Sequence, residues 1–385
     1  MSQLKVNTIR HTGASSDAIT LASDGTATAK ITNNLSNKNL VINGAMQVNQ
    51  RGTTSTTDFG IKVVDRFNGN ATNWDERPTQ AWVDVASGTT PYNLGFRKAF
   101  KWTNGNQTSG AGGSDVVSIE YKSESQDIAT SGWNYKSATE FLTISFWVKS
   151  SVAQEFLCQL YNADTDETYI FVYTVSSADT WQKITHSVKG DSSLNFNNDN
   201  GQGLEMMWYL FVGTDQTIAS PSLETWATYS GTDTKKDMTS TWYTTNDATF
   251  ELTGVQWEVG DTATDFEHRS YADELNRCLR YYQQYPKAGD AYGPLFNCAN
   301  QTSTTTQGVF SFPEMRVKPS MDDSGNFRVL FNDGALGVTG LSYINIQKST
   351  AIIRATVSSG LSAETASNVT VNNDATAKIT LSSEL

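Results

Sequence analysis

Tryptophan and tyrosine are the residues whose chemistry is easiest to interpret in this sequence. The chain has 10 Trp and 15 Tyr, and several lie in polar segments rich in turn-forming residues. A flat aromatic ring can pack against the apolar C–H face of a sugar while nearby Asn, Asp and Thr side chains bind its hydroxyl groups. The alternative is that most of these rings fill the interior of the fold or a seam between chains. The sequence predicts a glycan contact at Trp133, Tyr135, Trp226, Tyr229 and Trp242.

Signals of catalysis are weaker. The three histidines, His11, His186 and His268, lie on separate segments, and the glycine-rich run 110–114 lacks the lysine and following helix of a phosphate-binding loop. A glycosidase needs two carboxyl groups about 5–10 Å apart, a distance that sequence cannot show. The acidic run 164–167 could bind Ca²⁺ or form an exposed turn, so metal binding stays open. We therefore name no catalytic residue and expect no cofactor.

Composition and charge exclude several partners. The chain of 385 residues is 38% hydrophobic and 18% charged, with a formal net charge of −12. Nucleic acids and anionic membranes require a basic surface, so neither is expected to bind. No stretch approaches the roughly 20 apolar residues that span a bilayer, and the N-terminus does not resemble a signal peptide. The three widely spaced cysteines predict neither a disulfide framework nor a zinc site.

Alternation of apolar and polar residues with a period of two dominates the chain. In the run 141–148, one face carries Leu142, Ile144, Phe146 and Val148, which is typical of a strand. Turn-forming residues separate the runs, so the pattern predicts a mainly β protein built around an antiparallel sandwich. Similar alternating runs occupy residues 81–85, 116–121, 169–175, 204–212 and 250–259.

One segment has a helical pattern. Ser270 with Asp273 resembles a capping box, and Pro286 stops the helix soon after its last turn. These signals predict a connecting helix over 270–284. Its apolar stripe, at helical spacing, consists of Leu275, Cys278, Leu279 and Tyr282.

The patterns divide the chain into four parts. A large sandwich is expected over 38–269, the helix over 270–284, and a smaller C-terminal β domain over 285–385. The first segment, 1–37, alternates but contains few large apolar groups, and an isolated hairpin is marginally stable in water. We expect segment 1–37 to be stabilised by another chain. The C-terminal domain also looks poor in apolar residues and is expected to depend on neighbouring copies.

Several phrases of the sequence carry a resemblance to a known family. They are NLVINGAMQVNQRG at 39–52, VDRF at 64–67, TISFWVK at 143–149, TWQKI at 180–184, and TGVQWEVG at 253–260 followed by ATDFEHRSY at 263–271. Together they resemble tail-fibre and appendage proteins of tailed bacteriophages, particularly marine and cyanobacterial ones. The similarity covers about residues 1–285.

This resemblance implies a jelly-roll sandwich similar to carbohydrate-binding modules. It also implies a homotrimeric virion protein, made in the host cytoplasm and displayed on the tail or capsid, that recognises a host-surface glycan during adsorption. Residues 1–37 would attach it to other tail or capsid proteins. The family has no shared catalytic motif that maps onto this chain, so we expect no enzyme. Two alternatives remain: a non-binding structural component, such as a capsid decoration, stalk or adaptor, and a polysaccharide depolymerase.

Overall fold

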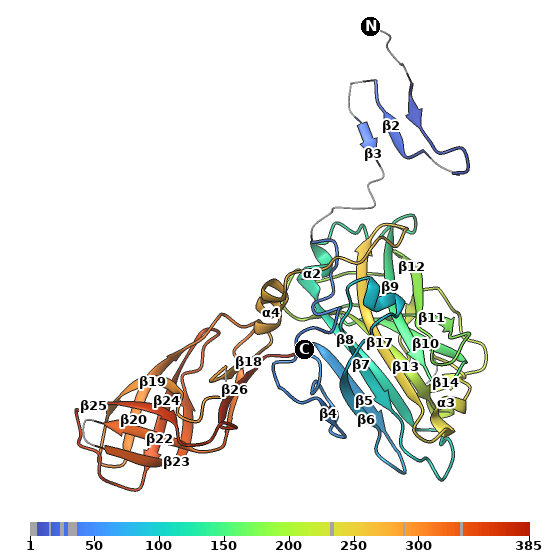
Figure 1. Ribbon diagram of the computed structural model, residues 1–385. Helices are drawn as coiled ribbons and strands as arrows, with labels where there is room; N and C mark the ends of the chain where they lie inside the picture. The colour runs from blue at the N-terminus through green and yellow to red at the C-terminus, as the bar shows by residue number, and fades with distance from the viewer. Residues whose placement is uncertain are drawn as a thin grey trace.

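The computed structural model describes residues 6–14, 17–23, 27–29, 37–231, 235–287, 289–331 and 334–385 (Figure 1). Strands dominate these ranges, and the helices are short. No helix within them is long and apolar enough to cross a membrane. The dominance of strands confirms the prediction of a mainly β protein.

The first sheet of the sandwich has six strands. Its interior strand β13 lies between β8 and β10, and every pairing is antiparallel. In spatial order the strands are β15 (Ala227–Thr228), β11 (Glu167–Thr174), β10 (Glu155–Asn162), β13 (Gln202–Val212), β8 (Val116–Glu124) and β5 (Phe67–Thr72).

The second sheet also has six strands. Its interior strand β17 lies between β7 and β9, and the pairings are again antiparallel. Because the chain crosses repeatedly between the sheets and inserts β13 and β17 into their middles, the sandwich is a jelly roll, as predicted. In order the strands are β12 (Gln182–Lys189), β9 (Phe141–Ser150), β17 (Thr249–Val259), β7 (Lys98–Thr103), β6 (Thr79–Asp84) and β4 (Ser55–Thr56).

The inward faces of the two sheets form one large hydrophobic core. The alternating side chains Leu142, Ile144, Phe146 and Val148 of β9 are all buried in it, as the period of two requires. Short elements close the ends and one side of the sandwich: α1 (Thr90–Asn93), α2 (Ser125–Ala129), η1 (Thr214–Gln216), β14 (Thr217–Ile218), β16 (Lys235–Lys236) and α3 (Thr241–Thr244).

Helix α4 (Tyr271–Leu279) joins the sandwich to the C-terminal domain (Figure 1). Its N-cap is Ser270, whose side chain accepts a hydrogen bond from the backbone N–H of Asp273 at 3.2 Å, which confirms the predicted cap. The helix ends earlier than predicted. Tyr282–Tyr285 forms strand β18, because pairing with a distant strand satisfies its backbone groups instead.

The C-terminal domain is a closed six-stranded barrel beside a small sheet. The barrel order is β19 (Pro294–Asn300), β20 (Thr305–Ser311), β24 (Thr350–Val357), β23 (Gly334–Ile344), β22 (Phe327–Phe331) and β25 (Ala366–Val371). The sheet pairs β18 with β26 (Lys378–Ser382) and β26 with β21 (Ser320–Ser324). The domain has its own core, which includes Phe310, Val329 and Ile353. It is better filled than its composition predicted, because barrel closure gathers apolar residues from many strands.

A buried charge network fastens the end of the chain to the sandwich. Arg66 Nη1 lies 2.5 Å from Glu384 Oε2, and Arg51 bridges Asp65 Oδ1 at 3.1 Å and Glu384 Oε1 at 3.2 Å. Arg316 donates to the backbone oxygen of Glu384 at 3.0 Å. The network joins residues more than 300 positions apart, so the barrel domain is held to the sandwich by ion pairs as well as by α4.

The N-terminal sheet is small. It pairs β1 (Thr8–Ile9), β2 (Ile19–Leu21) and β3 (Ala27–Ala29) in antiparallel order. The side chains of Val6, Ile9 and Leu21 are exposed. A sheet of two- and three-residue strands that leaves these apolar side chains exposed has little to stabilise it on its own.

Candidate functional site

The structure buries three of the five aromatic residues predicted to contact a glycan. The exposed fractions of Trp133, Trp226 and Trp242 are 3%, 8% and 0%, and all three belong to the main core. The indole of Trp226 donates to the Lys189 carbonyl at 2.9 Å, and that of Trp242 to the Thr249 carbonyl at 3.1 Å. The prediction is wrong for these three, because polar loops fold back and use their indoles to fill the core and its margins.

Tyr135 and Tyr229 remain half-exposed. The ring of Tyr135 packs edge-on against Phe196, with centroids 5.0 Å apart. Tyr229 packs in the same way against Tyr161 of β10, at 5.2 Å. Glycan contact at Tyr135 and Tyr229 stays a prediction. Through its contact with Tyr161, Tyr229 lies beside a group of side chains on the first sheet that the sequence did not single out.

The first sheet presents an organised polar surface to its outer side, here called the outer face. Side chains alternate along each strand, so the residues between the core positions point outward together. The strand register aligns them in three rows across β10, β13, β8 and β5. The rows are Tyr161, Glu205 and Lys122; then Gln159, Met207, Glu120 and Asn68; then Leu157, Tyr209, Ser118 and Asn70.

Glu120 is the centre of a hydrogen-bond network on the outer face. Its Oε2 accepts from the Asn68 amide at 2.7 Å, and its Oε1 accepts from the Asn70 amide and the Ser118 hydroxyl, both at 3.0 Å. Three neutral donors from two strands therefore hold this carboxylate in one position. The same donors and acceptor are the groups that bind sugar hydroxyls.

Glu205 is the second carboxylate of the outer face. Its Oε1 lies 3.7 Å from the ammonium of Lys122, and its Oε2 accepts from the Gln202 amide at 2.9 Å. Burial raises the pKa of Glu205, and the nearby charge of Glu120 raises it further, while Lys122 and the Gln202 hydrogen bond oppose both effects. Glu205 is therefore a carboxyl group that gains a proton more readily than an exposed glutamate.

Three tyrosines supply the aromatic part of the outer face. Tyr161 donates to Asp166 Oδ1 at 2.9 Å, and burial together with that carboxylate raises the pKa of Tyr161 to about 12. Tyr209 donates to the Gln159 side chain at 3.2 Å. Tyr229, directly after β15, packs against the ring of Tyr161. Tyr161 and Tyr229 are half-exposed and combine apolar area with polar groups, as a sugar ring requires. Tyr209, in contrast, is buried in a cluster with Leu157 and Met238 and supports the other two from below.

Residues 214–231 and 235–238, which follow β13, pack on the outer face and are together called the strap. The strap is closed by the parallel pairing of β14 with β16 and by a hydrogen bond from Thr217 to Asp237. Lys236 Nζ pairs with Glu155 Oε1 of β10 at 2.5 Å, and Met238 packs against the apolar residues of the face. The strap brings Lys235 to the sheet: Nζ lies 5.6 Å from the ring centroid of Tyr209.

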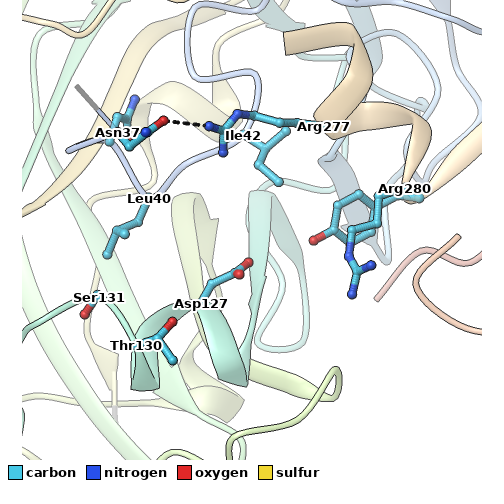
Figure 2. Close-up of a pocket in the computed structure, with 10 residues that line it drawn as sticks. Asn37, Leu40, Ile42, Asp127, Thr130, Ser131, Arg277 and Arg280 are labelled. Atoms are coloured by element: carbon cyan, nitrogen blue, oxygen red, sulfur yellow. Dashed lines mark hydrogen bonds between the residues drawn. The ribbon is translucent and has the colours of Figure 1, made fainter. Parts of the chain in front are cut away.

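A pocket lies at the joint between the sandwich and α4. Figure 2 shows this pocket of about 340 Å³, whose wall includes Asn37, Asp127, Arg277 and Arg280. Arg277 donates to the Asn37 side chain at 2.9 Å, and Arg280 forms two hydrogen bonds to Glu124, at 2.6 and 2.7 Å. Because both guanidinium groups are already engaged by protein atoms, the pocket is explained as part of the joint.

The phrases that carry the phage resemblance meet near this joint. The Asn39 side chain accepts from the backbone N–H of Trp257 at 3.1 Å, and the backbone N–H of Asn43 donates to Glu274 at 2.6 Å. Arg269 donates to the Val41 carbonyl at 3.0 Å. These residues fasten the first part of the sandwich onto β17 and α4, so their role in this chain is structural.

The acidic run considered for Ca²⁺ forms the turn between β10 and β11. Asp164 accepts hydrogen bonds from the Ser125 hydroxyl at 2.5 Å and from the Asn197 side chain at 2.7 Å. Among the residues whose placement is described, no group of three or more His, Cys, Asp or Glu side chains could hold a metal ion. The hydrogen bonds from Ser125 and Asn197 therefore explain the position of Asp164 as part of a turn.

No protein-family model and no curated protein sequence matches the chain. Solved structures with a similar fold include the enzymatically active domain of tailspike protein 4 from bacteriophage CBA120. It is 9% identical, with a TM-score of 0.31 over 58% of this chain and 21% of that one. The present chain thus spans about a fifth of the tailspike domain's length.

Carbohydrate-binding modules form the other group of neighbours. A family 11 module from Clostridium thermocellum, solved with a β-1,3-1,4-mixed-linked tetrasaccharide, is 12% identical, with a TM-score of 0.25 over 53% of this chain and 91% of that one. A family 22 xylan-binding domain from Paenibacillus barcinonensis is 10% identical, with a TM-score of 0.26 over 55% and 94%. Each similarity concerns the sandwich fold alone. The jelly-roll assignment stands on this chain's own strand order.

Proposed function

We propose that this chain is a phage virion appendage that binds a host-surface glycan on the outer face of its first sheet and does not cleave it. The observation that carries the proposal is the pair of half-exposed tyrosines, Tyr161 and Tyr229, which lies on the same sheet face as the half-exposed Glu120 network. Aromatic rings would cover the apolar face of a sugar, and the Glu120 network would bind its hydroxyl groups.

We further propose that the appendage is a homotrimer attached to other tail or capsid proteins through residues 1–37. The support is the N-terminal sheet, whose short strands leave Val6, Ile9 and Leu21 exposed. Identical chains around a three-fold axis would cover these side chains. Several weak glycan sites on one particle then act together, so adsorption does not require a tight single site. A mass in solution of three times the 42.2 kDa chain is expected, and a stable monomer at micromolar concentration contradicts the trimer.

Replacing Tyr161 with alanine is expected to weaken glycan binding by about fivefold or more. The magnitude is taken from the stacking of a base on an aromatic side chain, which is worth roughly 1–3 kcal/mol. The measurement is titration of the full-length protein with a glycan identified on an array of bacterial surface polysaccharides. A matched control is Tyr292→Ala, which removes an exposed tyrosine from the C-terminal domain.

Equal loss of affinity in both tyrosine variants, or no loss in Tyr161→Ala, would place the site elsewhere. Silence of the intact protein on the array, combined with normal incorporation into virions, favours the purely structural role.

One observation favours a depolymerase as the second candidate function. Glu205 of β13 lies opposite Lys122 of β8. Glu120 is two residues before Lys122 on β8, so the two glutamates are diagonal neighbours on adjacent strands. Such neighbours are about 7–8 Å apart, within the range of about 5–10 Å used by glycosidase pairs. The raised pKa of Glu205 suits a general acid.

The two functions differ in one measurable product. Incubation of the protein with its bound polysaccharide is expected to release no reducing ends. Release that disappears in Glu205→Gln would establish the depolymerase instead.

A further inference from the structure

A pocket separate from the outer face lies at the end of the sandwich far from the C-terminal domain, and is here called the end pocket. Strand β5 starts directly after Arg66, which belongs to the joint with that domain, and ends at Thr72. The end pocket, of about 290 Å³, follows it, between the turn 73–75 and the loop 107–115. Figure 1 shows α3, which contributes Tyr243 to the pocket, on the far side of the sandwich from α4.

The end pocket is accessible from solvent, and every residue of its wall belongs to the described part of the chain. Asn73, Asp75, Ser109 and Gly112 are exposed members of this wall, whereas Tyr243 is buried. A ligand can therefore reach these side chains. The volume is near the lower end of the about 300–1,000 Å³ that is typical of small-molecule sites, which suits a ligand the size of one sugar residue.

Hydrogen bonds hold the turn and the loop of the end pocket in one arrangement. The Asp75 carboxylate accepts from the Ser109 backbone N–H at 2.5 Å and from the Ser109 hydroxyl at 2.8 Å. The Asn73 side chain donates to the Ser114 carbonyl at 2.9 Å, and Tyr243 donates to the Asn73 carbonyl at 3.0 Å. A site that is formed before its ligand arrives avoids the entropic cost of ordering loops on binding.

The wall of the end pocket combines an aromatic ring with two carboxylates. Trp74 is half-buried and packs edge-on against Phe59, with ring centroids 4.9 Å apart. Hydrogen bonds from the backbone and side chain of Ser109 lower the pKa of Asp75, so this group is ionised at neutral pH. Asp115 accepts from one backbone N–H of the loop at 2.6 Å. An ionised carboxylate has about four acceptor sites, so both groups can accept further hydrogen bonds from a ligand.

The charge of the wall restricts the class of ligand. No lysine, arginine or histidine is among the residues that line the end pocket, all of which the structure describes. The two carboxylates would therefore repel an anionic sugar. What the wall offers is a ring for the apolar C–H face of a neutral sugar and charged acceptors for its hydroxyl groups.

We propose that the end pocket binds a single neutral sugar residue, such as the terminal unit of a glycan, whose ring packs on Trp74 and whose hydroxyl groups donate to Asp75 and Asp115. The end pocket shares no residue with the three rows of the outer face. The inference therefore does not depend on the glycan site proposed there. Each chain would present a second sugar site, and several sites on one particle act together.

The test uses the full-length protein, labelled with fluorotryptophan, and methyl glycosides of neutral hexoses and 6-deoxyhexoses. Fluorine NMR records the signals of the 10 tryptophans, and the Trp74→Phe variant assigns the signal of Trp74. At least one neutral glycoside is expected to shift this signal until it saturates. The uronic-acid analogue of that sugar is expected to bind less tightly, because its carboxylate meets those of Asp75 and Asp115.

Trp74→Ala is expected to weaken binding of this glycoside by about fivefold or more, as for loss of one stacked ring contact. The matched control is Tyr271→Ala, which removes an exposed tyrosine from α4 and is expected to leave the affinity unchanged. Thermal unfolding establishes that each variant is folded. If Trp74→Ala is not folded, the shift of the Trp74 signal in the intact protein decides the question.

The outcomes separate the end pocket from the outer face. Binding that persists in folded Trp74→Ala, or a Trp74 signal that no neutral glycoside shifts, overturns the end pocket. Polysaccharide binding that still depends on Tyr161 then leaves the proposed function standing. Glycoside binding that is lost in Trp74→Ala and retained in Tyr161→Ala supports the end pocket, even if the outer face binds no polysaccharide.

Discussion

Replacing Arg66 with alanine is expected to lower the free energy of unfolding of the sandwich by about 3–5 kcal/mol, because breaking a buried ion pair leaves its partner uncompensated. The Arg66 side chain is buried and lies 2.5 Å from Glu384. Its guanidinium carbon lies 3.5 Å from the ring centroid of Tyr281, and its Nη2 donates to the Lys122 carbonyl at 2.5 Å. The substitution therefore removes an ion pair, a ring contact and a hydrogen bond together.

Urea unfolding of the full chain measures the loss, and limited proteolysis shows whether the barrel domain separates from the sandwich more readily. The matched control is Arg77→Ala, which removes an arginine paired with Asp58 at 3.8 Å on the surface. Exposed pairs of this kind are worth about 0–1 kcal/mol. Similar effects of the two substitutions would contradict the structural role assigned to the buried network.

Trp242→Ala is expected to destabilise the protein by about 3–5 kcal/mol through loss of a large core side chain. Trp242 is fully buried, its indole donates to the Thr249 carbonyl, and its backbone N–H donates to the Gln154 side chain at 2.9 Å. This result would show in solution that an indole proposed from sequence as a glycan contact acts instead as a core residue.

Thermal or denaturant unfolding gives the stability of the Trp242 variant, and glycan titration below the transition gives its affinity. Trp181→Ala is the comparison, because Trp181 is only half-buried and packs at the margin of a smaller cluster. We expect a smaller loss of stability there. A Trp242 variant with unchanged stability but lost glycan binding would contradict the assignment of Trp242 to the core and support a glycan contact there.

The contact between Arg66 and Glu384 also ties the C-terminal domain to the sandwich. Glu384 lies at the end of the chain, beyond the last strand of the small sheet, yet its carboxylate is bound inside the sandwich joint. The barrel domain is thus tied to the sandwich by the residues on both of its sides, α4 and the chain end.

Local patterns determined the strands and the start of the helix. The alternation over 141–148 corresponds to β9, and Ser270 caps α4 through Asp273. Both features depend on residues that are neighbours in sequence, so a window of a few residues contains the necessary information. The same local reasoning extended the helix too far, because the pairing partner of β18 is almost a hundred residues away.

The candidate site shows the limit of such reasoning. Glu205 and Tyr209 of β13 and Glu120 of β8 lie in two runs, 204–212 and 116–121, that the sequence predicts as strands. Their meeting on one face was not, because it depends on the register between strands distant in sequence.

What the sequence alone determined was therefore a β-sandwich with a capped connecting helix. The tertiary structure decided which aromatic rings are buried, as for Trp226 and Trp242, and which charges pair, as for Arg66 and Glu384. Burial and pairing are properties of three-dimensional neighbours, and those neighbours come from loops and strands far apart along the chain.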